Sequence, residues 1–282
     1  MLSNALKSVA NQSHVNIELI VVNDGGCGVE SVIGNIEDSA IALKRIINFD
    51  SNQGRSAAAN AGLEVSTGEF VMFLDDDDWI SSEHIANLLE TLLQNNGYKA
   101  AYSSTACVKR EGASWRTISL FNFDYDGTRL LIENYIPIHS VLFSRSLLEL
   151  GCRFDTDFGW LEDWDFWIQV SRHTAFYFHD VTSAYYRVSD QSGFGSKNGQ
   201  TIESKYREMV YRKWSLQWSP AERLSVLDRA RSFPELTHLQ ELIDERNSDL
   251  EVRELQFDEL SRELATKGQH ILDLSNYMTT KD

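Results

Sequence analysis

Few cysteines, few basic residues and no long apolar run limit what this chain of 282 residues can be. Its three cysteines, Cys27, Cys107 and Cys152, lie far apart and outside CxxC spacing, which disfavours a disulfide framework and predicts three packed thiols in a reducing compartment. No apolar run approaches membrane-spanning length, and the first residues lack the apolar core of a signal peptide. We therefore expect a cytoplasmic protein, free or peripheral at the inner face of the membrane.

Positive charge is scarce as well. The 26 Lys and Arg residues are outnumbered by 42 Asp and Glu residues, so the formal net charge is -16. A charge of this sign repels phosphate backbones and anionic headgroups, and it predicts that nucleic acid is not a partner. The length allows one main globule with an appendage rather than two full domains.

The first hundred residues alternate between helix-like and strand-like segments. Leu2, Leu6 and Val9 fall on one helical face. We expect strands over 17–22, 45–49 and 70–74, the first of them buried, and helices over 56–65 and 81–95. Such alternation predicts a mostly parallel α/β sheet, in which ligands lie outside the carboxyl ends of the strands.

Beyond Ala100 the pattern becomes mixed and rich in aromatic residues. The sequence predicts a helix over 162–173 and strands over 101–108, 115–121, 139–143, 175–178 and 183–188. The following stretch, 189–199, is rich in Ser and Gly and is expected to be flexible. We place the main domain at 1–218.

The remaining tail, 219–282, has a different pattern, because apolar residues recur every seven positions over 236–278, with Leu239, Leu260 and Leu274 at the companion positions. Arg246, Arg253 and Lys267 interrupt those companion positions. One interpretation is a long helix lying on the globule. The other, which we favour, is a coiled coil that mediates self-association or links a further domain.

The strongest chemical signal is an acidic cluster, Asp75 to Asp78, directly after the apolar stretch 70–74. Asp75 and Asp77 are spaced as two ligands on one extended turn, and carboxylate oxygens are what Mg²⁺ or Mn²⁺ prefers. The alternative is a solvated acidic cap on the next helix, but four adjacent like charges would repel one another without a cation. We therefore expect a divalent metal that bridges to a diphosphate.

Three weaker signals accompany this cluster. Asp24 is followed by two glycines, so its carboxylate could face a nucleobase, or it could simply cap a helix. The segment Asn52 to Gly62 opens a helix with small residues, against which a nucleotide could lie, or which could serve tight packing. Glu162-Asp163-Trp164-Asp165 opens another helix, either as dipole compensation or with Asp163 as a general base.

Together the motifs resemble family 2 of the inverting glycosyltransferases with a GT-A fold. The family pattern Leu-x-x-Ala-Leu-x-Ser-Val-x-x-Gln is matched within residues 2–12, and Glu-Leu-Ile-Val-Val-Asp-Asp-Gly-Ser within 18–26. Asn-x-Gly-x-Ser-x-Ala-Arg-Asn-x-Gly is matched within 52–62, Phe-Leu-Asp-x-Asp-Asp within 73–78, and Glu-Asp-Trp-Asp at 162–165. Five motifs in order are far more specific than any one of them.

The resemblance implies a mixed GT-A sheet flanked by helices and a role for each motif. Asp163 would be the catalytic base, and Asp75 and Asp77 would hold the metal. Glu162 and the aromatic Trp160 and Trp164 would lie on the acceptor side. The donor is expected to be a nucleotide-sugar, most simply a UDP-sugar. The residues that would bind it are Asp24, Asn52, Gly54, Asn60, Asp75, Asp76 and Arg187, of which Asp75 would also hold the metal. The acceptor would be a glycan or a lipid-linked molecule of cell-surface polysaccharide synthesis.

The chain departs from the family pattern at several positions. Asn23 replaces an Asp, Gly26 a Ser, and Ala59 an Arg. The family also begins with a strand reading Ile-Ile-Pro-x-Tyr-Asn, whereas this chain starts inside the first helix, so we expect the first strand to be missing.

Two other functions stay open at this point. A phosphatase of the haloacid-dehalogenase type also uses an acidic strand end, but it needs Thr or Val where Trp79 stands. A non-catalytic nucleotide-sugar-binding or scaffold protein on a decayed transferase domain would account for a missing first strand, although the complete set of acids opposes it.

Overall fold

The computed structural model describes residues 1–36, 40–112, 114–188 and 199–231. Met1–Arg223 forms one compact unit, and a second unit begins at Leu224. The predicted heptads at 236–278 and almost all of the Ser-Gly stretch lie outside the described residues. No helix of the described part is both long and apolar enough to cross a membrane.

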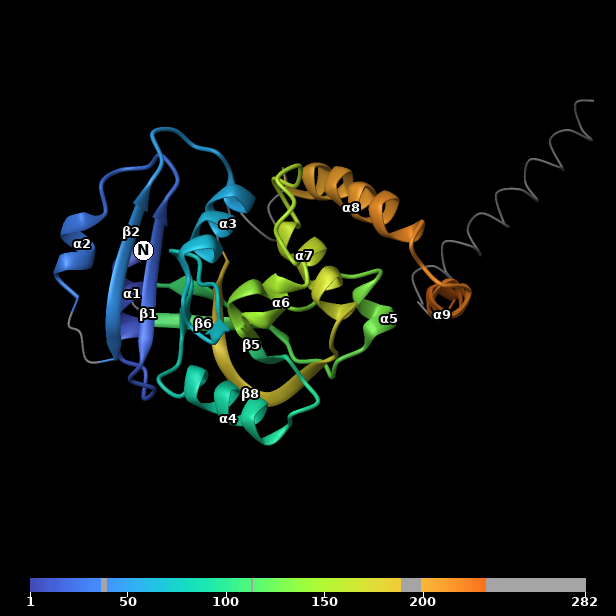
Figure 1. Cartoon of the computed structure of the whole chain (residues 1–282), viewed down its shortest axis with the longest axis horizontal. Coiled ribbons are helices and arrows are strands. Elements are labelled where there is room, and N and C mark those ends of the chain that lie inside the picture. Colours follow the sequence, from blue (N-terminus) through green and yellow to red (C-terminus); the bar gives the residue numbers. More distant parts are fainter. Residues whose placement is uncertain (37–39, 113, 189–198, 232–282) are drawn as a thin grey trace, which may run out of the picture. The chain divides into compact units, whose positions relative to one another are not determined.

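Two parallel strands, β1 (Ile17–Asn23) and β2 (Ile41–Asn48), form a small sheet of their own (Figure 1). The helix α1 (Leu2–Ala10) has the predicted apolar face and buries Leu6 and Val9 in a cluster that also contains Ile33 of α2 (Glu30–Gly34). β1 differs from the prediction of a buried strand, because all seven of its residues are only half-buried.

The larger sheet has the order β3-β7-β5-β8-β4, with β6 paired to the free part of β5. Its strands are β3 (Phe70–Val71), β4 (Trp79–Ile80), β5 (Ala100–Glu111), β6 (Ser114–Phe121), β7 (Val141–Ser144) and β8 (Phe176–Arg187). Only β5 and β8 run parallel, and every other pair is antiparallel. The parallel pairing predicted from the alternation is found between β1 and β2, but it does not extend to the larger sheet, which is mostly antiparallel. The expected mixed sheet flanked by helices is confirmed.

Helices cover these sheets at the positions that the sequence predicted. α3 (Arg55–Val65) packs on β1, where a side chain added at Gly62 would lie 3.6 Å from Val22. α4 (His84–Gln94) runs along the larger sheet (Figure 1). The other described helices are α5 (Gly127–Leu130), the 3-10 turn η1 (Ile138–Ser140), α6 (Ser146–Glu149), α7 (Glu162–Ser171), α8 (Gly199–Ser215) and α9 (Pro220–Arg231).

The centre of the core is aromatic and is organised by α7. Trp164, Phe166 and Trp167 are fully buried there. The indole N–H of Trp164 donates to the Leu130 carbonyl oxygen at 2.6 Å, and that of Trp167 donates to the Ile136 carbonyl oxygen at 3.1 Å. Because buried indole N–H groups need such acceptors, these two bonds fix how α7 sits and hence where its acidic first turn lies.

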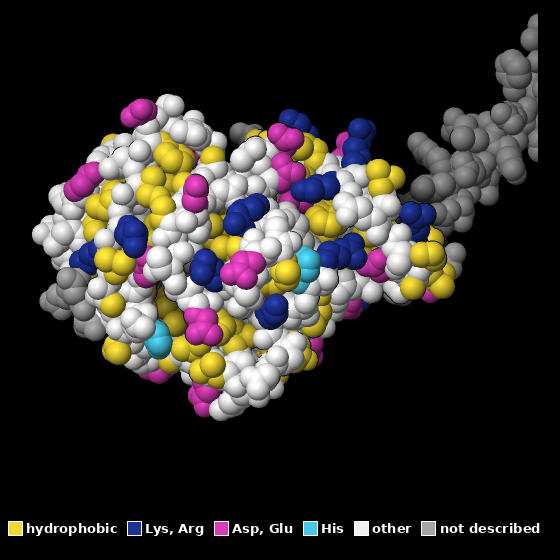
Figure 2. All heavy atoms as spheres, in the orientation of Figure 1, with side chains coloured by type: hydrophobic (Ala, Val, Ile, Leu, Met, Phe, Trp, Pro, Cys, Tyr) yellow, Lys and Arg dark blue, Asp and Glu magenta, His cyan; other side chains and the backbone are white. Residues whose placement is uncertain are grey.

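The surface carries both signs of charge. In Figure 2 the Lys and Arg side chains of the visible face are interspersed with Asp and Glu side chains. Of the three cysteines, Cys107 and Cys152 are buried as predicted, Cys27 is exposed, and all three are free thiols.

Candidate functional site

The acidic loop joins β3 to β4 and places its carboxylates at the end of the apolar stretch 70–74. Burial raises the pKa of the Asp75 carboxyl, the Arg55 guanidinium opposes this, and the charges of Asp77 and Asp76 add to it. Within the described part of the chain, neither the Asp76 nor the Asp77 carboxylate has a hydrogen-bond partner. These two side chains are therefore available to an external cation or ligand.

The loop alone is not a complete metal cage. The described residues contain no group of three or more His, Cys, Asp or Glu side chains that could hold a metal ion. Mg²⁺ is commonly held by one or two carboxylates together with substrate phosphates rather than by a dedicated protein cage. The carboxylates of Asp75 and Asp77 are of the type that such a site requires.

Asp24 connects two loops at the carboxyl ends of β1 and β2. Its carboxylate accepts the backbone N–H groups of Gln53 at 2.6 Å and Gly54 at 2.9 Å. Gly25 has a φ of 73°, and a Cβ there would lie 2.4 Å from the backbone nitrogen of Asn52, so only glycine lets the loops approach this closely. Asp24 thereby orders the segment that carries Asn52 and Gly54, and its contact with a base stays a prediction.

Asn60 has a role that the motif did not reveal. Its side-chain amide donates to the Phe154 carbonyl oxygen at 2.8 Å and accepts the Phe154 backbone N–H at 3.0 Å. Ser56, one turn earlier on α3, donates to the Phe158 carbonyl oxygen at 2.7 Å. The small-residue motif predicted to bind the donor thus forms hydrogen bonds to the loop that precedes α7.

Asp163 lies in the first turn of α7, and one oxygen atom of its carboxylate is held by hydrogen bonds within the protein. Its Oδ1 accepts the side-chain N–H of Asn134 at 3.0 Å and the backbone N–H of Trp164 at 2.8 Å. Among the described residues no donor reaches Oδ2. Burial raises the pKa of the Asp163 carboxyl above its usual range, although these hydrogen bonds oppose the rise. A held carboxylate with one free, more basic oxygen is suited to accept a proton.

Glu162 precedes Asp163 and is 7% exposed. Burial, and next the Asp163 charge, raise the pKa of Glu162 to about 7. Leu161 enters the helix with a φ of 60°, a left-handed conformation that is rare for a leucine and that turns the chain sharply into the acidic first turn. Strain of this kind is often found at functional sites.

Arg55 and Trp160 lie beside these acids. The Arg55 guanidinium is 3.7 Å from the Glu162 carboxylate and lies over the Trp160 ring at 5.8 Å from its centroid. Arg55 also interacts electrostatically with Asp75 and Asp163, so one cation connects the acidic loop to the first turn of α7. Sequence reasoning did not select Arg55, although it lies inside the segment Asn52 to Gly62.

Trp164 is placed differently from the prediction. It was expected on the acceptor side, but it is fully buried with its indole N–H bonded to Leu130. Of the two predicted acceptor-side tryptophans, only the half-buried Trp160 can reach a ligand.

Asp78 and His139 form a buried pair that sequence reasoning missed. Asp78 is 1% exposed and accepts the Arg187 backbone N–H at 2.8 Å, while its Oδ2 lies 3.2 Å from His139 Nδ1. Burial raises the pKa of Asp78 to about 8 and lowers the pKa of His139 to about 3, which in each case favours the neutral form. The hydrogen bond from Arg187 joins Asp78 to the end of β8, and Arg187 was predicted to bind the donor.

We expect Asp78→Asn to alter the pH dependence of stability. A carboxyl whose pKa is raised on folding contributes stability that is fully present below its unfolded pKa and is lost as the pH rises through about 8. Asparagine keeps an acceptor for the Arg187 N–H and does not ionise. Between about pH 5 and about pH 9, wild type should lose about 4 kcal/mol that the variant does not lose, so the Tm of the variant relative to wild type should rise by roughly 10 °C. The exposed Asp180→Asn is the control, and an equal Tm difference at both pH values would contradict the assignment.

Comparisons with known proteins show what the chain is similar to. The family described as "Glycosyl transferase family 2" matches residues 1–151. A Campylobacter jejuni protein named "GalNAc(5)-diNAcBac-PP-undecaprenol beta-1,3-glucosyltransferase" is 28% identical over 219 residues, covering 74% of this chain and 69% of the relative. The "Uncharacterized glycosyltransferase YwdF" of Bacillus subtilis is 26% identical, covering 80% of this chain and 84% of the relative.

Solved structures give the same fold. The crystal structure of Staphylococcus aureus TarS 1-349 in complex with UDP has a TM-score of 0.59 at 18% identity, and the match covers 83% of this chain and 68% of that one. Against a longer TarS chain the match covers 67% of this chain and 35% of that one, at a TM-score of 0.54. Identities this low establish the fold alone.

Proposed function

The chain belongs to glycosyl transferase family 2 and is a glycosyltransferase of glycan synthesis, and on this premise we propose that it transfers a sugar in one inverting displacement. The donor is a nucleotide-diphospho-sugar, and the acceptor is a hydroxyl of a glycan or lipid-linked molecule. The observation that carries this proposal concerns the described residues: among them the Asp76 and Asp77 carboxylates of the acidic loop have no hydrogen-bond partner, and no donor reaches Oδ2 of Asp163.

In this mechanism Asp163 accepts the proton of the acceptor hydroxyl at Oδ2 while Asn134 and the Trp164 N–H hold Oδ1 in place. The oxygen of that hydroxyl attacks the anomeric carbon from the face opposite the nucleotide, and the nucleoside diphosphate leaves. Trp160 offers a ring against which a sugar face can pack, and Glu162 borders the acceptor.

Asp75 and Asp77 would hold a divalent cation such as Mn²⁺ or Mg²⁺. When bound, the cation supplies positive charge to the departing diphosphate. Arg55 lies between the acidic loop and Glu162 and supplies a fixed charge of the same sign. The backbone N–H of Arg187 donates a hydrogen bond to Asp78, which holds Arg187 next to the same loop. Asp24, Asn52 and Gly54 would bind the nucleoside.

The donor nucleotide is proposed to be UDP. Support comes from TarS, whose crystal structures include complexes with UDP and with UDP-GlcNAc. A lipid-linked acceptor is supported by the name of the Campylobacter jejuni relative. An acceptor of that kind would place the enzyme at a membrane surface.

We further propose that one more parallel strand fits between β1 and β3. In the described residues β1 pairs only with β2, and β3 pairs only with β7. Leu19 of β1 and Leu74 after β3 nevertheless pack against the same apolar cluster beneath α1. The half-buried β1 has unpaired backbone groups at this edge, and such groups can accept a neighbouring strand.

Inversion is tested by following the anomeric configuration of the released sugar. With UDP-GlcNAc or UDP-glucose and water as a slow acceptor, the first sugar seen by NMR, before mutarotation, should be the β-anomer, because both donors are α-linked. The α-anomer would contradict a single displacement. Donor binding without any turnover, even with added acceptor glycans, would favour a non-catalytic binding protein.

A further inference from the structure

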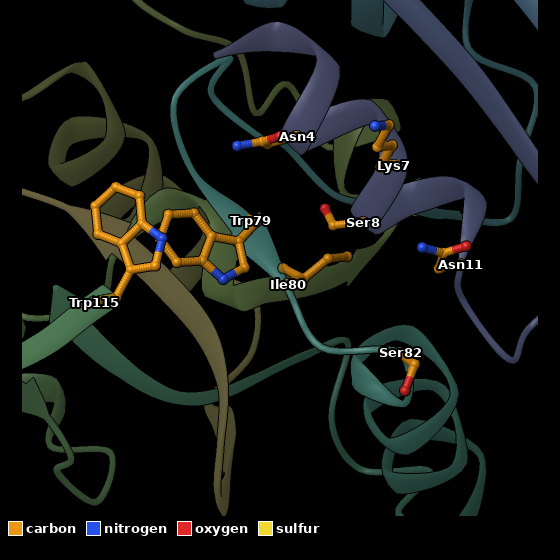
Figure 3. A pocket seen from close by; sticks show the side chains of 8 residues that line it. All are labelled: Asn4, Lys7, Ser8, Asn11, Trp79, Ile80, Ser82 and Trp115. Atoms are coloured by element: carbon orange, nitrogen blue, oxygen red, sulfur yellow. The ribbon is translucent and has the colours of Figure 1, made fainter. Parts of the chain in front are cut away.

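An open cavity lies between α1 and the strands β4 and β6, and none of the candidate catalytic residues lines it. Its volume is about 450 Å³, within the range of small-molecule pockets. Figure 3 shows the two indoles of Trp79 and Trp115 side by side at one end, with polar side chains of α1, including Asn4 and Lys7, on the other side. Asn11 and Ser82 extend the polar lining.

The two tryptophans form a rigid aromatic surface. Trp79 stacks on Tyr185, with 5.6 Å between ring centroids and an interplanar angle of 11°. This stacking fixes the orientation of the Trp79 ring. Trp115 lies 4.9 Å from Trp79 at an angle of 53° and is 40% exposed. A rigid, partly exposed aromatic pair of this kind buries apolar ligand surface at little entropic cost.

The opposite wall carries hydrogen-bonding groups that the protein does not use. Within the described residues, no hydrogen bond or ion pair engages the side chains of Asn4, Lys7 or Asn11, or the indole N–H groups of Trp79 and Trp115. The cavity therefore offers both donors and acceptors across from two aromatic rings.

We propose that this cavity is a second carbohydrate-binding site for a neutral oligosaccharide. A sugar ring has one C–H face that packs on an indole and a rim of hydroxyls that pairs with amides and an ammonium group. A nucleotide fits less well, because Lys7 is the single cation among the residues that line the cavity, while the whole chain has a formal net charge of -16. The proposal does not depend on the transfer chemistry, since none of the proposed catalytic or metal-binding residues lines the cavity.

The test is saturation-transfer NMR on the full chain with trisaccharides of glucose and of N-acetylglucosamine. At least one should bind with a Kd of about 1 mM, and Trp115→Ala should weaken it about tenfold or more, because one stacking surface is lost. Trp115→Phe should stay within about threefold of wild type, and Ile118→Ala, an exposed change on the same strand, should have no effect. Circular dichroism checks that each variant is folded.

Three outcomes would overturn the proposal. Neither trisaccharide binds wild type at about 20 mM, or Trp115→Ala binds as tightly as wild type does. In the third, UDP binds in a manner that depends on Trp115, which would make the cavity a nucleotide site.

Discussion

Asp163→Asn is expected to lower kcat for sugar transfer by about 10²–10⁴-fold while donor affinity changes little. Asparagine has nearly the same shape and keeps an acceptor for the Asn134 and Trp164 N–H groups, but it cannot take a proton. The loss should therefore appear in kcat and not in the Kd for the nucleotide. Steady-state kinetics together with calorimetric titration of UDP separate the two.

The pH profile distinguishes a base from a structural carboxylate. Because burial raises the pKa of Asp163, wild-type kcat should fall as the pH is lowered through a value above the ordinary range for aspartate. The residual activity of Asp163→Asn should lack that limb. Asp157→Asn, on the exposed loop before α7, is the matched control and should keep both rate and profile. A wild-type rate in Asp163→Asn would exclude Asp163 as the base.

Asp77→Ala is expected to remove metal-dependent nucleotide binding. Asp77 has no hydrogen-bond partner among the described residues, so its loss should leave the fold intact and remove one of two proposed cation ligands. We expect the Kd for UDP in the presence of Mn²⁺ to rise about 100-fold, which corresponds to roughly 2.7 kcal/mol. Titration calorimetry with and without Mn²⁺ measures this.

The control for Asp77→Ala is Asp180→Ala, which removes the same charge from an exposed position on β8. It should bind UDP and Mn²⁺ as wild type does. Equal affinities in Asp77→Ala and wild type would show that the acidic loop does not hold the cation. A loss of UDP affinity in Asp77→Ala that occurs only without Mn²⁺ would lead to the same conclusion.

Local patterns predicted the elements well and their pairing poorly. The helices around α1, α3 and α7 were found because apolar spacing and small or acidic first turns are local signals. The direction of each strand depends on long connections between strands, and these carry no local signal. The prediction therefore missed that the larger sheet is mostly antiparallel. β8 was predicted as two strands because Asp180, Val181 and Thr182 interrupt the apolar pattern, yet the strand continues through these exposed residues.

The site was predictable where one segment carries the chemistry. The acidic loop is one continuous segment, and so is the first turn of α7. The carboxylates of each could therefore be selected from the sequence. Asn60 and Trp164 matched the family pattern, but their structural partners lie in distant segments. The Asp78–His139 pair escaped notice for the same reason, since a lone histidine gives no sign of the buried carboxyl that it meets in the fold.

We propose a metal-dependent nucleotide-sugar site on this chain. Thermal unfolding of the chain with UDP, GDP and dTDP, each with and without Mn²⁺, shows whether that site exists. A ligand that binds only the folded state must raise Tm, by an amount set by its concentration relative to Kd. We predict that UDP raises Tm when Mn²⁺ is present and has little effect without it. An unchanged Tm for all three nucleotides with Mn²⁺ would contradict the account.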